Sequence, residues 1–501
     1  MSSNTGPSAG STEDPYSYHE GFGNFFTSEV EKFKGRAVPK DQSNPQKWNF
    51  HAEQLNGTSF VSPRETLQHV WFYRKTPSAS HGPIQKVEES EKGKCRVEAS
   101  FLATNDKVEY IPRELCWNPF IIPAAGNNNK NENSQKLKDK MPEIGVKGDV
   151  DFVDGIATIC GNGDPTMKEG VAVHIYVASK DMDNRAFCNN DGDMLILPQQ
   201  GRLDIQTEMG KMMVKPGELA VIQAGIRFTV KITKNKEGEK RARGYIQELF
   251  GTRYELPELG PIGSNGLALP RHFKFPMAHY DGDEKPKKWR IDTKLAGKFW
   301  YYDQESTPFD VAGWHGNYIP YKYAYNGFVP SGVIDRDQSD PSVYTVIRAN
   351  SKIPGVPMTE LYIFPPRWVA SRDSMRIPYY HRNMATEIIG VIEGEYPGSS
   401  RDVVAGGLSV QPSYMPHGET YEAYYNHTQE PTVAPVEIKD QNKFFMLHIS
   451  THCAITKFAE GKTVRQPLKG NRGTPSTYLG FHREEAAAFE QEMEKQKKQR
   501  K

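Results

Sequence analysis

Two histidines and a glutamate in the last third of the chain have side chains that could bind a metal ion. They are His381, Glu387 and His417. Two neutral imidazoles and one carboxylate on one side of a metal, with the opposite positions open, form the binding set of non-haem Fe(II) oxygenases, and zinc uses the same ligands. The competing interpretation is that these are ordinary surface or core residues, since the chain has 14 histidines.

The spacing of these residues limits the backbone that can bring them together. Side chains six residues apart point about 240° apart on a straight helix and lie roughly 20 Å apart along a straight strand. Ligands must come within about 2 Å of one metal ion. The chain is therefore expected to turn sharply near Arg382 to Met384, with Glu387 entering the strand TEIIGVIEG and His417 arriving from another strand.

Two β-rich blocks are expected to position these side chains. The first, from about 150 to 250, contains GVAVHIYVAS, DGDMLILPQ and IRFTVKIT, and the second, from about 341 to 455, contains MTELYIFPP, ATEIIGVIEGEY and KFFMLHIST. Short apolar runs separated by Gly, Asp and Pro are typical of antiparallel strands. The fold class is therefore predicted to be mainly β with few helices. His448 and His452 lie on the last run and are interpreted as structural.

The second block resembles the metal-binding motifs of cupin barrels, G-x5-H-x-H-x3,4-E-x6-G and G-x5-P-x-G-x2-H. His381, Asn383 and Glu387 follow the first motif with Asn in one ligand position, and the second motif ends on His417. That leaves His, Glu and His as ligands. In the first block, Gln223 and Phe228 replace the proline and the ligand histidine of the second motif, which predicts a barrel without metal.

A longer resemblance covers nearly the whole chain outside its polar insertions and tail. It rests on GFGNFFTSE at Gly21, VDFVDGIATICGNGDP at Val150, VAGWHGNYIPYKY, YIFPPRW, YYHRNMATEIIG and MPHG. With these segments the chain resembles the homogentisate 1,2-dioxygenase family. WHGNYxPYKY, and PPRW followed by YYHRN, are far more specific than the cupin motifs.

The resemblance implies an Fe(II) enzyme that opens the ring of homogentisate with O2 to give maleylacetoacetate in tyrosine and phenylalanine breakdown. His381, Glu387 and His417 match its iron ligands, and Tyr396 and His417 are expected to contact the substrate. His315 matches its catalytic histidine and is the candidate general base, since a near-neutral pKa suits taking a phenolic proton. The alternative for His315 is a core histidine stacked on Trp314, and the alternative for Tyr396 is a buried strand tyrosine. A homo-oligomer, trimer or hexamer, is also implied.

The chain departs from the family pattern at two positions. Gln411 stands where the family commonly has a further active-site histidine, and Ser399 stands where some members have lysine. Loss of two potential cations leaves open the same ring opening on another hydroquinone-type acid. A zinc- or manganese-dependent cupin isomerase or hydrolase, and a catalytically silent cupin, are further alternatives.

The predicted organisation is a two-domain, cupin-like (RmlC-like) β-sandwich or barrel protein. A polar, mobile tail is expected first, and the last segment has acidic residues early and basic residues late, which favours a solvated helix. Residues 125–141 and 233–244 are polar insertions, the second an exposed hairpin loop. The expected boundaries are 1–18 for the disordered tail, 19–325 for the β domain with the metal-free barrel, 326–480 for the iron-binding domain and 481–501 for the helical tail.

The overall charge excludes some partners. Lys and Arg number 63 and Asp and Glu number 62, so no overall field attracts nucleic acid or an anionic membrane. No window of 18 apolar residues occurs, and the first residues lack the basic start and apolar run of a secretory signal. A cytoplasmic protein acting on a small aromatic acid and O2 is therefore expected.

Overall fold

The fold is mainly β, as predicted. The computed structural model describes residues 13–28, 50–87, 96–123, 141–259, 264, 267–282, 285, 287–325, 344–369, 379–394, 403–419, 424–425, 436–438, 442–463 and 483–499. Within these ranges the strands form five sheets. The helical elements there are η2 (Pro165–Met167), η3 (Pro270–His272), α5 (Lys457–Glu460) and α7 (Arg483–Gln499), and residues 424 and 425 are also helical.

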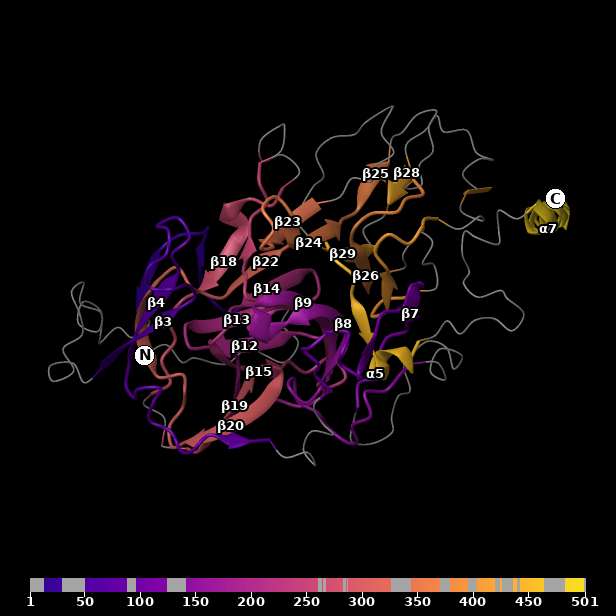
Figure 1. Ribbon diagram of the computed structural model, residues 1–501. Coiled ribbons are helices and arrows are strands. Elements are labelled where there is room, and N and C mark those ends of the chain that lie inside the picture. Colours follow the sequence, from indigo (N-terminus) through magenta and orange to yellow (C-terminus); the bar gives the residue numbers. More distant parts are fainter. Residues whose placement is uncertain are drawn as a thin grey trace.

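A ten-stranded sheet, here called the central sheet, runs through the middle of the molecule (Figure 1). Its inner strands are long runs of Val, Ile, Leu and Ala that are buried along almost their whole length, as expected for strands covered on both faces. In order across the sheet they are β1 (Tyr18–Glu20), β18 (Phe273–Pro276), β22 (Tyr321–Ala324), β14 (Glu218–Ile222), β11 (Gly192–Gln200), β16 (Ala242–Phe250), β9 (Glu169–Ala178), β8 (Ile156–Asp164), β30 (Ala454–Thr456) and β6 (Val108–Glu109).

Two seven-stranded sheets accompany the central sheet. The N-terminal sheet contains β13 (Gly210–Val214), β12 (Leu203–Thr207), β15 (Arg227–Ile232), β10 (Arg185–Asn189), β19 (Trp289–Leu295), β20 (Lys298–Gln304) and β5 (Gln85–Lys86). The C-terminal sheet contains β17 (Tyr254–Glu255), β23 (Tyr344–Asn350), β24 (Pro357–Phe364), β29 (Lys443–Ile449), β26 (Thr386–Glu393), β27 (Leu408–Gln411) and β7 (Leu115–Trp117).

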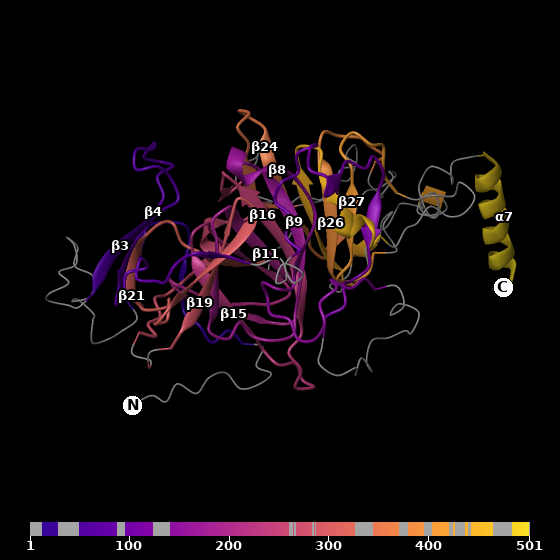
Figure 2. The same ribbon diagram turned by 60° about the horizontal axis from the view of Figure 1, so that its bottom comes forward.

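Two smaller sheets complete the described structure. The four-stranded sheet contains β2 (Phe25–Ser28), β21 (Val311–Gly316), β4 (His69–Arg74) and β3 (His51–Asn56), and the two-stranded sheet pairs β25 (Arg367–Val369) with β28 (Val436–Ile438). In two views related by 60°, the four-stranded sheet and the β26–β27 pair lie on opposite sides of the molecule (Figures 1 and 2).

One apolar core joins the central and C-terminal sheets. Val173 and Leu195 of the central sheet belong to the same buried cluster as Ile388 and Leu447 of the C-terminal sheet. Tyr245 of β16 adds a polar link, because its hydroxyl donates to the carbonyls of Val391 and Gly407 at 3.0 and 2.8 Å. Since Ile388 and Leu447 face this core, their strand neighbours Glu387 and His448 face the other side of the sheet.

Strands cross the boundary expected at residues 325 and 326. β7 and β17 precede that boundary and are the edge strands of the C-terminal sheet, whereas β30 follows it and pairs with β8 in the central sheet. The two halves of the chain therefore share sheets as well as a core.

The ends and insertions differ in part from the expectation. Residues 13–18 were expected in the disordered tail, but the Asp14 carboxylate accepts from Lys322 Nζ at 2.6 Å and from the Tyr18 hydroxyl at 2.8 Å. That part of the prediction is wrong, because Lys322 is buried and requires a counter-ion. Residues 1–12 and 124–140 lie outside the described residues. The hairpin loop expected over 233–244 is confirmed in part by the bridge between Lys234 and Lys240, whereas residues 242–244 are buried in β16, and the expected tail helix is α7.

Candidate metal centre

A backbone bridge places the two histidines side by side. The amide of His381 donates to the carbonyl of His417, and the amide of His417 donates to the carbonyl of His381, both at 3.0 Å. Residues directly opposite in an antiparallel pair direct their side chains to the same face. The two imidazole centroids are accordingly 4.4 Å apart.

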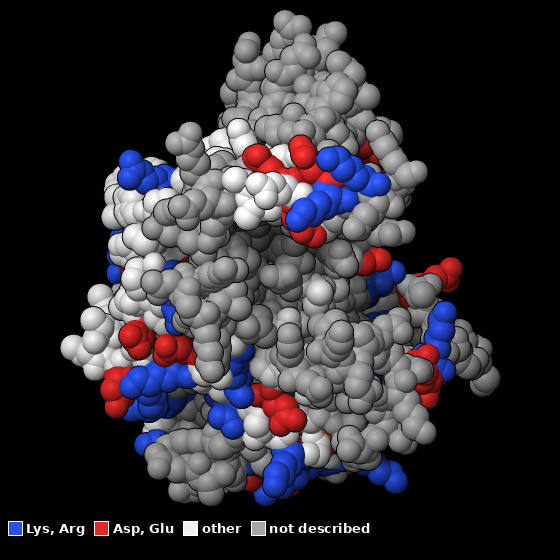
Figure 3. Space-filling model, turned by 90° about the vertical axis from the view of Figure 1, so that its right-hand side faces the viewer, with Lys and Arg blue, Asp and Glu red and all other residues white. Residues whose placement is uncertain are grey.

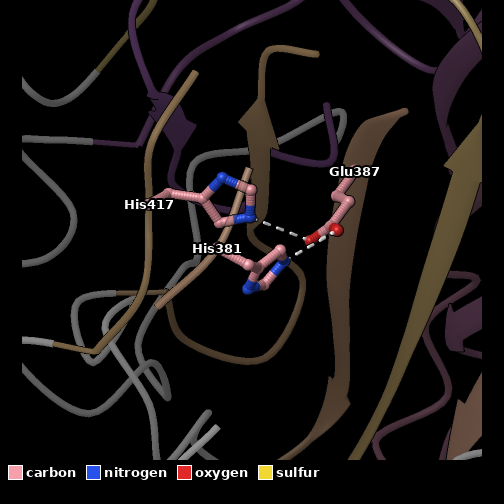
Figure 4. Close-up of side chains that lie close together, drawn as sticks. All are labelled: His381, Glu387 and His417. Atoms are coloured by element: carbon pink, nitrogen blue, oxygen red, sulfur yellow. Dashed lines mark hydrogen bonds and ion pairs between the residues drawn. The ribbon is translucent and has the colours of Figure 1, made fainter. Parts of the chain in front are cut away.

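Glu387 reaches the two histidines from the second residue of β26 (Figure 4). The chain bends at Met384 and Ala385 before the strand begins, which meets the need for a sharp turn deduced from the spacing. Oε1 of Glu387 lies 3.3 Å from Nε2 of His381, and Oε2 lies 3.2 Å from Nε2 of His417. One ligand atom from each of the three residues lies within 4.8 Å of the others.

The histidines are held in the orientation that a metal site requires. Nδ1 of His381 lies 2.9 Å from the carbonyl of Tyr379, and Nδ1 of His417 lies 2.9 Å from the carbonyl of Met415. A backbone carbonyl at Nδ1 favours the tautomer with its proton there, which leaves the Nε2 lone pair as the ligand. Both Nε2 atoms face the carboxylate, so the residues fit a divalent cation.

Asn383 orients the carboxylate. Its Nδ2 donates to Glu387 Oε1 at 2.7 Å, while its Oδ1 accepts from the amide of Ala385 at 2.9 Å. Its carbonyl accepts from the amide of Tyr414 at 2.6 Å, which ties this turn to the one before His417. The cupin motif indicated Asn383 as a residue in a ligand position, but its contacts make it a support for the ligand Glu387.

Neighbouring side chains hold Glu387 in the ionised form. Burial by itself raises the pKa of this carboxyl, but the contacts with the imidazoles of His381 and His417 and the hydrogen bond from Asn383 outweigh burial, and the pKa lies well below its usual range. The side chain is 8% exposed. A carboxylate that is ionised at neutral pH can bind a cation without first losing a proton.

His315 does not lie at this centre within the chain. It is on β21 in the four-stranded sheet, which is on the opposite side of the molecule from β26 and β27 (Figures 1 and 2). Its Nε2 lies 3.1 Å from the hydroxyl of Tyr73, on which it stacks. Trp314 points to the buried face of the strand, so the alternative of a core histidine stacked on Trp314 is not what the structure shows.

The surroundings of His315 explain the sequence motif around it. Burial, and secondarily His69, lower the pKa of His315, which keeps the imidazole neutral near pH 7. Gly316 follows with φ of +145°, and a Cβ there would lie 2.2 Å from the carbonyl of His69. The glycine after the histidine is therefore required by the close approach of β4. Tyr73 could not be recognised from the sequence as a partner of His315, because β4 is far from β21 along the chain.

Other predicted site residues have different outcomes. Tyr396 and Ser399 lie outside the described residues. Gln411 is buried on β27 directly opposite Glu387, so its side chain shares the face of the ligand.

One face of the molecule and the described helices can be compared with the charge and hydropathy of the sequence. On the face drawn in Figure 3, described Lys and Arg side chains alternate with Asp and Glu and form no patch of one sign. Within the described part of the chain, no helix is both long and apolar enough to span a membrane.

The fold and the site define a mainly β protein with a candidate His–Glu–His metal-binding set beside its C-terminal sheet. Family models described as "Homogentisate 1,2-dioxygenase N-terminal" and "Homogentisate 1,2-dioxygenase C-terminal" match residues 17–325 and 326–470. The chain belongs to the homogentisate 1,2-dioxygenase family.

Relatives from distant organisms have the same name. The chain is 40% identical to homogentisate 1,2-dioxygenase of Homo sapiens, over 88% of this chain and 91% of that protein. It is 38% identical to the Drosophila melanogaster protein, over 89% and 93%, and 40% identical to the Arabidopsis thaliana protein, over 81% of each. A cupin 2 conserved barrel domain protein from Leptotrichia buccalis has 9% identity and a TM-score of 0.23, over 60% of this chain and 89% of that chain.

Proposed function

We propose that the protein is an Fe(II)-dependent ring-cleaving dioxygenase that converts homogentisate and O2 to maleylacetoacetate in tyrosine and phenylalanine catabolism. The observation that carries this proposal is the convergence of His381, Glu387 and His417, with both Nε2 atoms directed at one carboxylate. Membership of the family supplies the reaction and the substrate.

The three side chains would hold Fe(II) on one face. Bound iron supplies the redox chemistry that lets O2 react with a closed-shell aromatic ring, and zinc lacks that chemistry. Asn383 keeps the carboxylate of Glu387 directed at the two imidazoles. His417, 14% exposed, is proposed to contact the substrate as well as the iron.

His315 is proposed as the base that takes a phenolic proton from the substrate. Its lowered pKa keeps the imidazole neutral at neutral pH, and the Tyr73 hydroxyl beside Nε2 holds the ring and can relay the proton. Because His315 and Glu387 lie on opposite sides of one chain, this role requires a second copy of the protein.

A homo-oligomer, trimer or hexamer, therefore belongs to the proposal. Exposed apolar side chains occur at both places that would meet. Phe26, 56% exposed, is paired with His315, whereas exposed aromatic and methionine side chains surround the candidate metal ligands. Exposed apolar patches of this kind mark protein interfaces. Those around the ligands are Tyr379, Tyr380, Met384, Tyr414 and Met415.

Tyr396 is proposed to donate a hydrogen bond to the substrate, as the family resemblance implies. A second candidate function, the same ring opening on another hydroquinone-type acid, is favoured by Gln411. This neutral amide is buried on the face of Glu387 and cannot supply the positive charge that an imidazole can.

Oxygen uptake by anaerobically purified, iron-loaded protein tests the proposal. Homogentisate should cause stoichiometric O2 consumption and a conjugated ring-opened product, whereas protein loaded with zinc should consume none. Faster turnover of gentisate or a ring-substituted analogue than of homogentisate would favour the second candidate. Turnover of any substrate without O2 would favour a metal-dependent isomerase or hydrolase and contradict the proposal.

A further inference from the structure

Four polar residues form one row across the C-terminal sheet. The Cα partners are Glu360 with His448, His448 with Glu387, and Glu387 with Gln411, on β24, β29, β26 and β27. Directly opposite residues of antiparallel strands direct their side chains to the same face, with Cβ atoms about 4.5–5.5 Å apart. His448 is therefore a neighbour of Glu387 on the face that carries the candidate metal centre.

The next row on this face is mostly apolar. Tyr362 is opposite Met446, Met446 is opposite Ile389, and Ile389 is opposite Ser409. Ile389 belongs to a separate buried apolar cluster, and Tyr362 and Met446 pack against that cluster. The polar row therefore lies between this apolar row and the two histidines that approach Glu387. An aromatic ring bound beside the polar row would contact apolar side chains as well as the candidate metal ligands.

A carboxylate lies beside His448. Nδ1 of His448 is 3.4 Å from Oε2 of Glu360, an ion-pair contact without hydrogen-bond geometry, and the Tyr362 hydroxyl donates to the same oxygen at 2.8 Å. The negative charge beside Nδ1 favours the tautomer with the proton on that nitrogen. Nε2 is then an acceptor, and the strand order places Glu387 on the opposite side of His448 from Glu360.

Nε2 of His448 is free to accept a ligand's hydrogen bond. Among the described residues it has no hydrogen-bond partner, and the side chain is 20% exposed. The carboxylates of the row are engaged, since Glu387 accepts from Asn383 and contacts the two histidines, and Glu360 accepts from Tyr362. A buried ring hydroxyl that is not on the metal requires an acceptor to avoid the cost of an unsatisfied donor.

We infer that Nε2 of His448 accepts a hydrogen bond from a ring hydroxyl of the substrate, with Glu360 as the residue that positions His448. This inference rests on the proposed function, because it assigns the position of the same aromatic acid. It makes His448 a residue that selects dihydroxy over monohydroxy aromatic acids. A site that accepts from a substrate hydroxyl binds the analogue without that hydroxyl poorly.

Binding to the full-length, iron-loaded protein without O2 tests the inference. The ligands are homogentisate, 2-hydroxyphenylacetate and 3-hydroxyphenylacetate, so that each ring hydroxyl is removed in turn. The wild-type protein is compared with His448→Asn, which keeps a polar atom near Nδ1, and His448→Gln, which places one near Nε2. One lost hydrogen bond corresponds to about a tenfold change in Kd.

His448→Asn should weaken homogentisate binding about tenfold and should weaken binding of one monohydroxy analogue less than twofold. His448→Gln should restore most of the loss, and Glu360→Gln should cause a smaller loss with the same dependence on that hydroxyl. Iron content should stay unchanged. His81→Asn is the matched control, because this histidine is exposed outside the C-terminal sheet and should leave all three Kd values unchanged.

Equal weakening for all three ligands, or no weakening for homogentisate, overturns the role of His448. These outcomes are distinct from failure of the proposed function, which would appear as absence of homogentisate binding and O2 uptake in the wild-type protein. If His448→Asn does not fold, the Kd values of His448→Gln, Glu360→Gln and the wild-type protein for the three ligands still test the role of His448.

Discussion

The chemistry of single residues explains why the ligand set could be predicted. Imidazole and carboxylate side chains are recognisable by type, and their spacing excluded a straight helix or strand. The direction of an amide or imidazole is not visible in a sequence, because it depends on contacts far along the chain. The supports of the ligands, such as Asn383 and the carbonyls of Tyr379 and Met415, therefore required coordinates.

Removing a ligand and removing the proposed base should have different effects. His381→Ala or Glu387→Ala should abolish iron retention, because two remaining ligands bind weakly. His315→Ala should keep its iron and lose about 10²–10⁴-fold in turnover, the usual contribution of a general base. Metal analysis and oxygen uptake measure the two effects. Stoichiometric iron in His381→Ala would show that the ligand assignment is wrong.

Asp193 should make the protein less stable as the pH rises. Burial raises the pKa of Asp193 from 3.8 to about 7, although the amide of Ala224 donates to its carboxyl at 2.9 Å. Between these values the unfolded chain loses a proton that the folded protein retains. The stability is fully present below pH 4 and falls as the pH rises to 7, by at most about 4 kcal/mol.

Asp193→Asn keeps the acceptor for Ala224 and removes the titration. Its urea midpoint should exceed that of wild type at pH 8 by more than at pH 5. Asp193→Ala removes the acceptor as well as the titrating group, so it should show the same pH dependence relative to wild type, with lower urea midpoints than Asp193→Asn at both pH values. Parallel pH profiles for wild type and Asp193→Asn would contradict the neutral state of Asp193.

At the scale of elements, the strands could be predicted but their register could not. Runs such as TEIIGVIEG and KFFMLHIST show which residues alternate, but not which residue of a distant strand lies opposite. Gln411 was recognised in the sequence as a departure from the family pattern. His448 was interpreted as structural, because only the pairing of β26 with β29 places it beside Glu387.

A buried ion network connects strands of the central and N-terminal sheets. Nζ of Lys294 on β19 donates to Asp191 at 2.7 Å and to Glu248 on β16 at 2.6 Å. Glu248 also contacts Nε2 of His174 on β9 at 3.3 Å. All four side chains are buried, so the ammonium group is an internal counter-ion for two carboxylates.

Lys294→Met should destabilise the protein by about 3–5 kcal/mol, because two buried carboxylates lose their cation. The free energy of unfolding in urea measures the loss. Lys298→Met is the matched control, since Lys298 begins the neighbouring strand β20 and is exposed, and it should change stability by less than about 0.5 kcal/mol. Similar losses for both variants would show that the network contributes little.

At the scale of the whole molecule, a sequence can indicate an oligomer only through its relatives. The family resemblance implied a trimer or hexamer, but nothing in the sequence showed that His315 and Glu387 would lie apart. The sequence also did not show that strands of the first half join the C-terminal sheet, since β7 and β17 are only three and two residues long. Short edge strands are recognised by what they pair with, and their partners here lie in the other half of the chain.

A site shared between copies makes a prediction that a site within one chain does not. His315→Ala lacks the base and Glu387→Ala lacks the metal, so each variant alone should be inactive. If the two are unfolded together, mixed in equal amounts and refolded with iron, some sites combine the intact ligands of one copy with the intact His315 of another. In a closed ring with random mixing, about a quarter of the sites are of this kind, so activity should return to about a quarter of that of refolded wild type.

A mixture of Glu387→Ala with His381→Ala is the control and should stay inactive, because both variants lack ligands from the same set. Activity near zero in the first mixture, with mixed oligomers verified by mass spectrometry, would mean that His315 does not serve the metal centre of a neighbouring copy.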